Sequence, residues 1–114
     1  MKGFFDGIGQ WAVTFRCQDV LPGQVVKFAA EGQAAACEAG DPFCGCVVSV
    51  ARDRSACSVA LGGIVTTSFS GTAPAIGWCG LAADGSGGVS AAASGQAYRV
   101  VDVDAASHSV TFVL

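Results

Sequence analysis

Apolar and polar residues alternate along much of the chain, which is the period-two pattern of β-strands with one buried face. The clearest case is segment 11–17, in which Trp11, Val13, Phe15 and Cys17 would share the buried face. Segment 29–40 is ambiguous between a short helix and a short strand, and strand is favoured. The other expected strands are 24–28, 43–50, 57–61, 64–69, 78–81, 97–103 and 109–114.

Turn residues separate these segments about every ten residues, the spacing of an all-β sandwich or barrel. Leu21-Pro22-Gly23, Asp41-Pro42 and Asp84-Gly85 are the strongest turn signals. Gly45 interrupts a strand pattern, which predicts a bulge or a close backbone approach. No segment keeps the apolar spacing of a capped helix. We therefore expect an all-β fold: a compact small β-barrel or sandwich of about eight to ten short strands.

The N-terminal segment 1–10 is expected to be an arm on a single β domain of residues 11–114. Phe4 and Phe5 lie among glycines, so these apolar side chains sit on a backbone too flexible to hold itself. The arm either packs on its own core or docks on another subunit or partner by strand addition. In the second case, Phe4, Phe5 and Trp11 would be the partner-binding residues.

Charge is sparse, and this excludes several classes of protein. Only 13% of residues are charged against 52% hydrophobic, and six basic residues against nine acidic ones give a net charge of −3. A basic surface for nucleic acid is absent. The charge-free run 55–83 is long enough to span a bilayer, but glycines and Pro74 break it, so strands and turns are expected there. Neither a membrane segment nor a signal peptide is apparent, which places synthesis in the cytoplasm.

The six cysteines allow two further interpretations. They could form three disulfides, but without an export signal buried free thiols are expected instead. A zinc site built from Cys37, Cys44, Cys46 and Cys57 lacks the usual C-x2-C spacing. Cys44 and Cys46 are expected on one face of a strand, too far apart for an easy disulfide.

No residue is assigned a catalytic, cofactor-binding or metal-binding role, and no cofactor is expected. The single imidazole, His108, is expected in an exposed hairpin loop. Two alternatives remain open. One is a small ligand-binding barrel whose cavity would be lined by Trp11, Phe15, Trp78 and Tyr98, although these aromatics are more simply explained as core residues. The other is a metal or redox domain that uses Cys44 and Cys46.

The order of several short motifs also resembles a known family. The motifs are Gly23-Gln24-Val25-Val26-Lys27, Gly40-Asp41-Pro42-Phe43-Cys44-Gly45-Cys46-Val47-Val48, Val59-Ala60-Leu61-Gly62-Gly63-Ile64-Val65-Thr66, Leu81-Ala82-Ala83-Asp84-Gly85 and Val110-Thr111-Phe112-Val113. In this order they resemble small tailed-phage capsid decoration (cement) proteins over about residues 20 to 114. The resemblance implies a prophage-encoded, non-enzymatic β domain. Such a protein would bind the major capsid protein on the outside of the mature head as a homotrimer, and would end on the virion surface.

Overall fold

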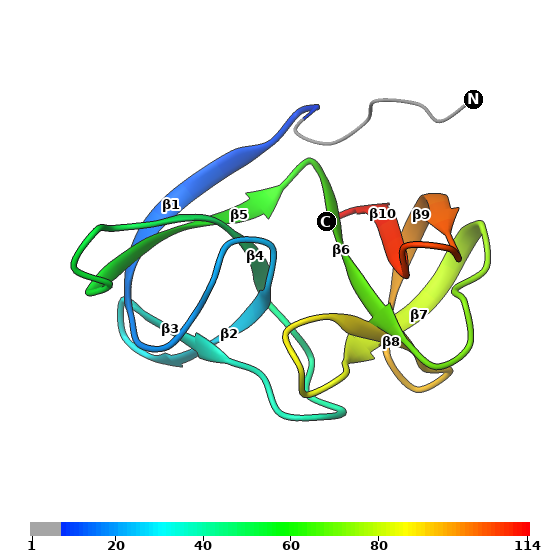
Figure 1. Cartoon of the computed structure of the whole chain (residues 1–114), viewed down its shortest axis with the longest axis horizontal. Coiled ribbons are helices and arrows are strands. Elements are labelled where there is room, and N and C mark those ends of the chain that lie inside the picture. Colours follow the sequence, from blue (N-terminus) through cyan, green and yellow to red (C-terminus); the bar gives the residue numbers. More distant parts are fainter. Residues whose placement is uncertain (1–7) are drawn as a thin grey trace.

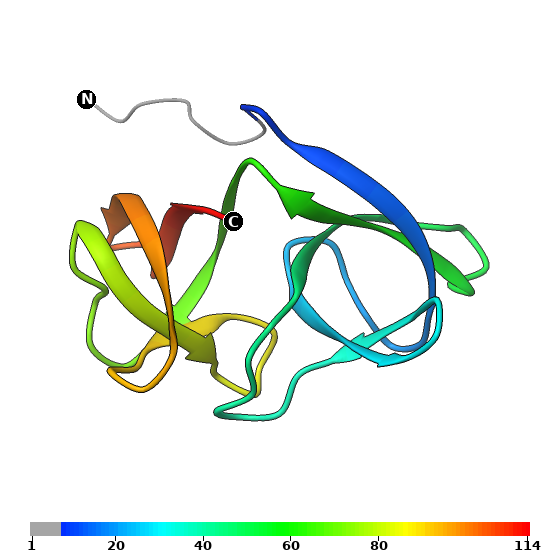
Figure 2. The same ribbon diagram turned by 180° about the vertical axis from the view of Figure 1, so that it is seen from behind.

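The computed structural model describes residues 8–114, and these residues form ten β-strands and no helix (Figures 1 and 2). The all-β prediction is confirmed. The strands are β1 (Trp11–Cys17), β2 (Val25–Ala30), β3 (Gln33–Ala36), β4 (Gly45–Val50), β5 (Ala56–Gly62), β6 (Ile64–Ser70), β7 (Gly77–Ala83), β8 (Val89–Ala91), β9 (Gln96–Asp104) and β10 (Ser109–Val113). Nowhere between residues 8 and 114 is there a helix with the length and apolarity needed to span a bilayer.

The strands close into two small barrels that lie side by side (Figure 1). Barrel 1 contains β1 to β5 in the order β1-β3-β2-β4-β5, and barrel 2 contains β6 to β10 in the order β10-β6-β8-β7-β9. In barrel 1, β1 pairs with β3 in parallel and with β5 antiparallel; in barrel 2, β6 pairs with β8 in parallel and with β10 antiparallel. The five strands of each barrel therefore follow the same path, β1 to β5 matching β6 to β10 in order.

The match extends to single residues. Val47 pairs with Val59 in barrel 1, and Val100 pairs with Phe112 in barrel 2. In β4 and in β9 the register shifts directly after this pair, so Val48 and Val101 are equivalent bulge residues. Two short sequences repeat as well: Phe28-Ala29-Ala30-Glu31-Gly32 matches Leu81-Ala82-Ala83-Asp84-Gly85, and both closing glycines have positive φ. The chain is thus a tandem repeat of one five-stranded unit.

Two apolar clusters hold the molecule together. The smaller one fills barrel 1 and includes Val26, Val47 and Val59. The larger one spans both barrels, since it joins Val25 and Phe43 of barrel 1 to buried residues of β6, β7, β8, β9 and β10. Burial of apolar surface between the barrels therefore stabilises their packing in the same way as it stabilises each interior.

Hydrogen bonds reinforce the contact between the barrels. The Val25 amide donates to the Gly87 carbonyl at 2.8 Å, and the Gly40 amide donates to the Ala83 carbonyl at 2.8 Å. The buried Thr67 hydroxyl donates to the Gly23 carbonyl at 2.6 Å. Because buried polar groups must be paired, these bonds fix how one barrel sits on the other.

Most of the expected strands are present, including the strand favoured for segment 29–40, and two expectations need correction. Segment 29–40 contains the end of β2 and the strand β3, and β8 was not expected at all. The 11–17 segment is a strand, but Trp11 and Val13 are exposed, so only its Cys17 end is fully buried. Gly45 does mark a close approach, because a Cβ there would lie 2.5 Å from the Ala60 carbonyl oxygen.

Candidate functional site

The second and fourth strands of each barrel, β2 and β4 or β7 and β9, carry a face that points away from the barrel interior. We call it the head face. In barrel 1 it contains Val25 and Cys46, which are partners across β2 and β4. Val26, the neighbour of Val25, points into the barrel interior, so Val25 points outward. At the equivalent positions of barrel 2, Trp78 and Arg99 are partners across β7 and β9.

The first and second strands of each barrel, β1 and β2 or β6 and β7, carry another pair of equivalent residues. We call this pair the tail face. In barrel 2 it contains Val65 and Leu81, and in barrel 1 the equivalent residues are Val13 and Phe28. Val13 pairs with Val59, as Val65 pairs with the equivalent Phe112. Phe28 and Leu81 open the repeated pentapeptide described above.

The two barrels are packed head to tail. The head face of barrel 1 and the tail face of barrel 2 belong to the same buried cluster. Exposure at equivalent positions differs accordingly: Val25 is 0% and Trp78 is 72% exposed, Val65 is 2% and Val13 is 39%, and Leu81 is 0% and Phe28 is 46%. Among residues 8–114, the head face of barrel 2 and the tail face of barrel 1 are therefore left exposed.

The free head face combines an aromatic with a basic side chain. The Arg99 guanidinium lies over the Trp78 ring, 5.5 Å from its centroid, which holds the indole against the strand by a cation–π contact. Ile76 and Val101 are also exposed and lie next to this pair along the strands. Tryptophan and arginine are the residue types that contribute most to binding at protein interfaces.

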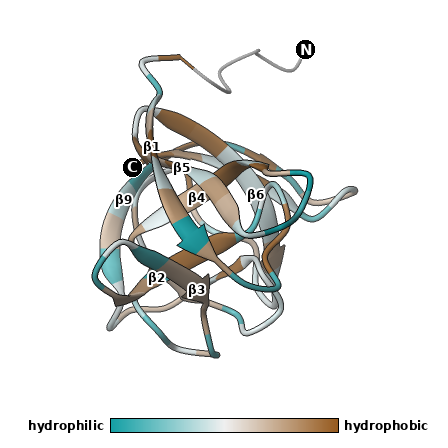
Figure 3. Ribbon diagram, turned by 90° about the vertical axis from the view of Figure 1, so that its left-hand side faces the viewer, coloured by the Kyte–Doolittle hydropathy of each residue, from teal (hydrophilic) through white to brown (hydrophobic). Residues whose placement is uncertain are grey.

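The free tail face lies toward the viewer in Figure 3, along β1 and β2. Phe28 contacts Phe15 with ring centroids 5.0 Å apart, so its ring is anchored although nearly half of it is exposed. Trp11 begins the same strand as Val13 and lies over Gly62, whose missing side chain makes room for the indole. Of the three predicted partner-binding residues, Trp11 is exposed on the surface, and Phe4 and Phe5 lie outside the described residues.

The aromatic cavity expected for a ligand-binding barrel is not formed. Trp11 and Trp78 are exposed on different barrels, and Phe15 packs on Phe28. Tyr98 stacks on Phe43 at 4.9 Å between ring centroids, and burial raises the pKa of its hydroxyl. The interpretation of these four aromatics as core residues is likewise wrong for the two tryptophans.

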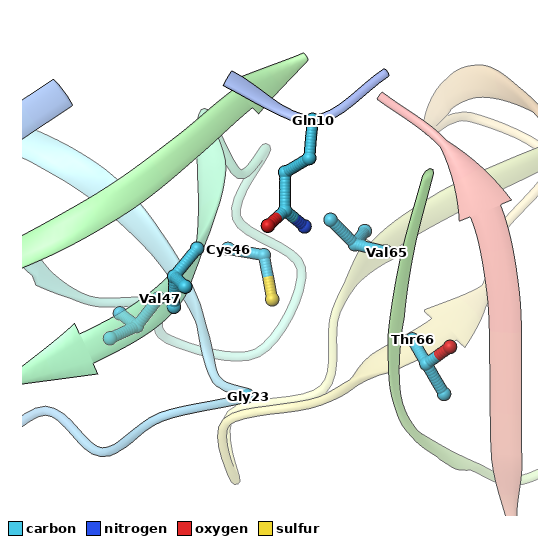
Figure 4. A pocket seen from close by; sticks show the side chains of 7 residues that line it. Gln10, Gly23, Cys46, Val47, Val65 and Thr66 are labelled. Carbon is cyan, nitrogen blue, oxygen red and sulfur yellow. The ribbon is translucent and has the colours of Figure 1, made fainter. Parts of the chain in front are cut away.

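A small cavity lies between the barrels, with a volume of about 160 Å³ (Figure 4). Cys46 and Val47 line it from barrel 1, and Val65 and Thr66 line it from barrel 2. The Gln10 side chain reaches into it and donates from Nε2 to the Ile64 carbonyl at 3.5 Å. The lining residues that the structure describes offer apolar side chains, one thiol, the Gln10 amide and the Thr66 hydroxyl, and they include no carboxylate or imidazole for acid–base chemistry.

The six cysteines are reduced and have different surroundings. Cys17 and Cys57 are both buried in barrel 1, and burial together with the Cys17 thiol raises the pKa of Cys57 to about 12. Burial raises the pKa of Cys37 to about 11. Cys44 is exposed and precedes β4, whereas Cys46 is buried, so the expectation that they share one strand face is wrong.

No group of three or more potential metal ligands occurs between residues 8 and 114, and the four cysteines weighed for a zinc site all lie in that range. His108 is exposed, as expected, and stacks on Phe69 at 5.5 Å. The closest charged pair joins Lys27 Nζ to Asp41 Oδ2 at 2.7 Å, and that same oxygen accepts a bond from the Glu38 amide.

No protein-family model matches this chain, and no curated protein matches it with significant similarity.

Proposed function

We propose that this chain is a non-enzymatic decoration protein of a tailed-phage capsid, which binds the major capsid protein on the outside of the mature head as a homotrimer. The observation that carries the proposal is the exposure of large apolar side chains on a molecule whose barrels already have filled interiors. Trp78, Trp11 and Phe28 are the main examples. A surface that is apolar and nearly uncharged is suited to being covered by a partner.

The proposed mechanism is thermodynamic. A protein that binds the mature lattice and not its immature or disrupted forms stabilises the mature state by RT ln(1 + [L]/Kd) at every site. A trimer that contacts several capsid subunits at once gains effective concentration, so modest contacts suffice. In this scheme the arm residues Phe4 and Phe5 and the neighbouring Trp11 contact the capsid. The order of motifs that resembles decoration proteins supports the same role.

The test uses capsids assembled from the major capsid protein encoded beside this chain. Expanded and unexpanded particles are sedimented with the full-length protein, and binding is expected to the expanded particles alone. Bound protein should raise the temperature at which the particles break. Deletion of residues 1–7 should weaken binding while leaving the far-ultraviolet circular dichroism unchanged. Absence of the protein from both kinds of pellet would reject the proposal.

A further inference from the structure

We propose that this protein assembles with further copies of itself head to tail, the free head face of barrel 2 in one copy packing on the free tail face of barrel 1 in the next. The occupant of both exposed faces is therefore a second copy of this chain. This inference goes beyond the capsid role, because it concerns contacts between copies and holds whether or not a capsid is the partner.

The contact inside each chain is the template for the proposed contact between chains. Within the chain, the head face of barrel 1, with Val25 and Cys46, covers the tail face of barrel 2, with Val65 and Leu81. Both barrels have the same strand order and an equivalent bulge in the fourth strand, so each has both sets of positions. Each chain therefore has one exposed head face, on barrel 2, and one exposed tail face, on barrel 1. These are the two kinds of face that pack on each other inside the chain.

The residues on the leftover faces fit this role. The exposed head face replaces Val25 by Trp78 and Cys46 by Arg99, two side chains with larger contact areas. The exposed tail face has apolar residues at both marker positions, Val13 and Phe28, on the strand sides that also carry Cys17 and Val26 of the barrel interior. These two side chains are 39% and 46% exposed, so a second copy that covers them would bury apolar surface.

The geometry of such a contact decides the form of the assembly. A head-to-tail contact is heterologous, and repeating it gives a closed ring or an open filament. Three copies closing on one another would give a ring of alternating first and second barrels, which is consistent with the proposed trimer. In contrast, a two-fold dimer through the head face would bring Trp78 of one copy against Trp78 of the other and would leave both tail faces exposed.

The decisive experiment uses one variant for each face. Trp78→Asp places a carboxylate on the head face, and Val13→Asp places one on the tail face. Leu21→Asp is the control, since Leu21 is a 50% exposed aliphatic residue in the loop before β2 and belongs to neither free face. Analytical ultracentrifugation of the full chain should show an oligomer for the wild type and the control. The two face variants should self-associate at least about tenfold more weakly.

Mixing the two variants separates head-to-tail packing from the alternatives. The Val13→Asp chain keeps an intact head face, and the Trp78→Asp chain keeps an intact tail face. The mixture should therefore form a one-to-one heterodimer and nothing larger, although each variant alone is monomeric. Circular dichroism establishes that each variant is folded, and the milder pair Trp78→Ala and Val13→Ser replaces any variant that is not.

Several results would overturn the inference. A wild-type chain that is monomeric at high micromolar concentration has no such contact. An oligomer that survives Trp78→Asp, or a mixture of the two monomeric variants that forms no heterodimer, would show that other surfaces are used. A wild-type oligomer that behaves as expected but does not bind capsids would reject the capsid role alone.

Discussion

Val25 and Trp78 occupy equivalent positions in the two barrels, yet Val25 is completely buried and Trp78 is 72% exposed. The difference arises because barrel 2 covers this outer face of barrel 1, whereas no part of the described chain, residues 8–114, covers the same face of barrel 2. The same position is thus apolar in both barrels, but the contact between the barrels buries it only in barrel 1.

Phe43 is the side chain that ties the barrels together most directly. It comes from the loop before β4, is buried, and contacts Tyr98 and Phe112 of barrel 2 at centroid distances of 4.9 and 5.8 Å. Replacing it by alanine removes these contacts and leaves a cavity, so Phe43→Ala should lower the free energy of unfolding by about 3–5 kcal/mol. Urea titration followed by circular dichroism measures this.

The control for that prediction is Phe28→Ala, because Phe28 is also in a ring pair but is half exposed. Its cost should be clearly smaller in the monomeric Trp78→Asp background. The wild type should unfold in one transition, since the larger cluster spans both barrels. Two separate transitions, or equal losses in the two variants, would contradict a shared core.

The Lys27–Asp41 pair should make stability depend on pH in a predictable direction. The hydrogen bond from Lys27, together with the Glu38 amide, holds the pKa of Asp41 below its usual value, and the bond to Asp41 raises the pKa of Lys27. The Asp41 contribution is therefore complete above the unfolded-state pKa of about 3.9 and is lost as the pH falls through the lower folded value. The Lys27 contribution is lost only as the pH rises through a value above 10.5.

The measurement is the urea midpoint at pH 6 and pH 2.5 for the wild type and Asp41→Asn. The wild type should lose more stability on acidification than the variant. Lys27→Met, which removes the partner and keeps the carboxyl, should also lose less stability than the wild type. An acid response of Asp41→Asn as steep as that of the wild type would show that the pair does not contribute.

The sequence was sufficient for the class of fold and insufficient for the repeat. Period-two alternation located β1, β9 and β10 because each strand has a distinct buried side. It missed β8, since three residues carry too little pattern. A sequence trace of the repeat is the match between Phe28-Ala29-Ala30-Glu31-Gly32 and Leu81-Ala82-Ala83-Asp84-Gly85. A match of five residues is too short to predict a repeat until the structure shows both segments at equivalent places in the two barrels.

The exposed faces were harder still to predict. Alternation assigns Trp11 and Val13 to the same buried face as Cys17, but both are exposed. Burial differs between the two ends because it depends on whether another element covers the strand, which is a tertiary property. Trp78 was taken as core for the same reason: a large apolar residue in a strand is usually covered.

Thiol reactivity should follow burial among the six cysteines. Cys44 is exposed and should react rapidly with a disulfide reagent at pH 8, and Cys79, which is partly exposed, should follow more slowly. Cys37 and Cys57 should be slower by about 10²-fold or more, because their raised pKa values of about 11 and about 12 leave little thiolate. Cys44→Ser should remove the fast phase alone. Rapid reaction of all six would mean that barrel 1 opens readily.

Gly45 and Gly62 both lie too close to neighbouring atoms to carry a side chain, but only at Gly62 can the neighbour move away. A Cβ at Gly45 would lie 2.5 Å from the Ala60 carbonyl oxygen and 2.6 Å from Val59 Cγ1, both in the packed interior. Gly45→Ala should therefore force backbone shifts and lower the free energy of unfolding by about 1–3 kcal/mol. At Gly62 the obstacle is the indole of Trp11, which is exposed and able to swing outward.

Gly62→Ala should consequently cost less than about 1 kcal/mol and should instead move the indole. In a Trp78→Phe background, Trp11 is the single tryptophan, so its emission maximum reports the displacement. We expect a shift to longer wavelength for Gly62→Ala and none for Gly45→Ala under native conditions. Equal destabilisation by the two substitutions would mean that Trp11 is held as firmly as the barrel interior, and that this end of β1 is a fixed part of the surface available to a partner.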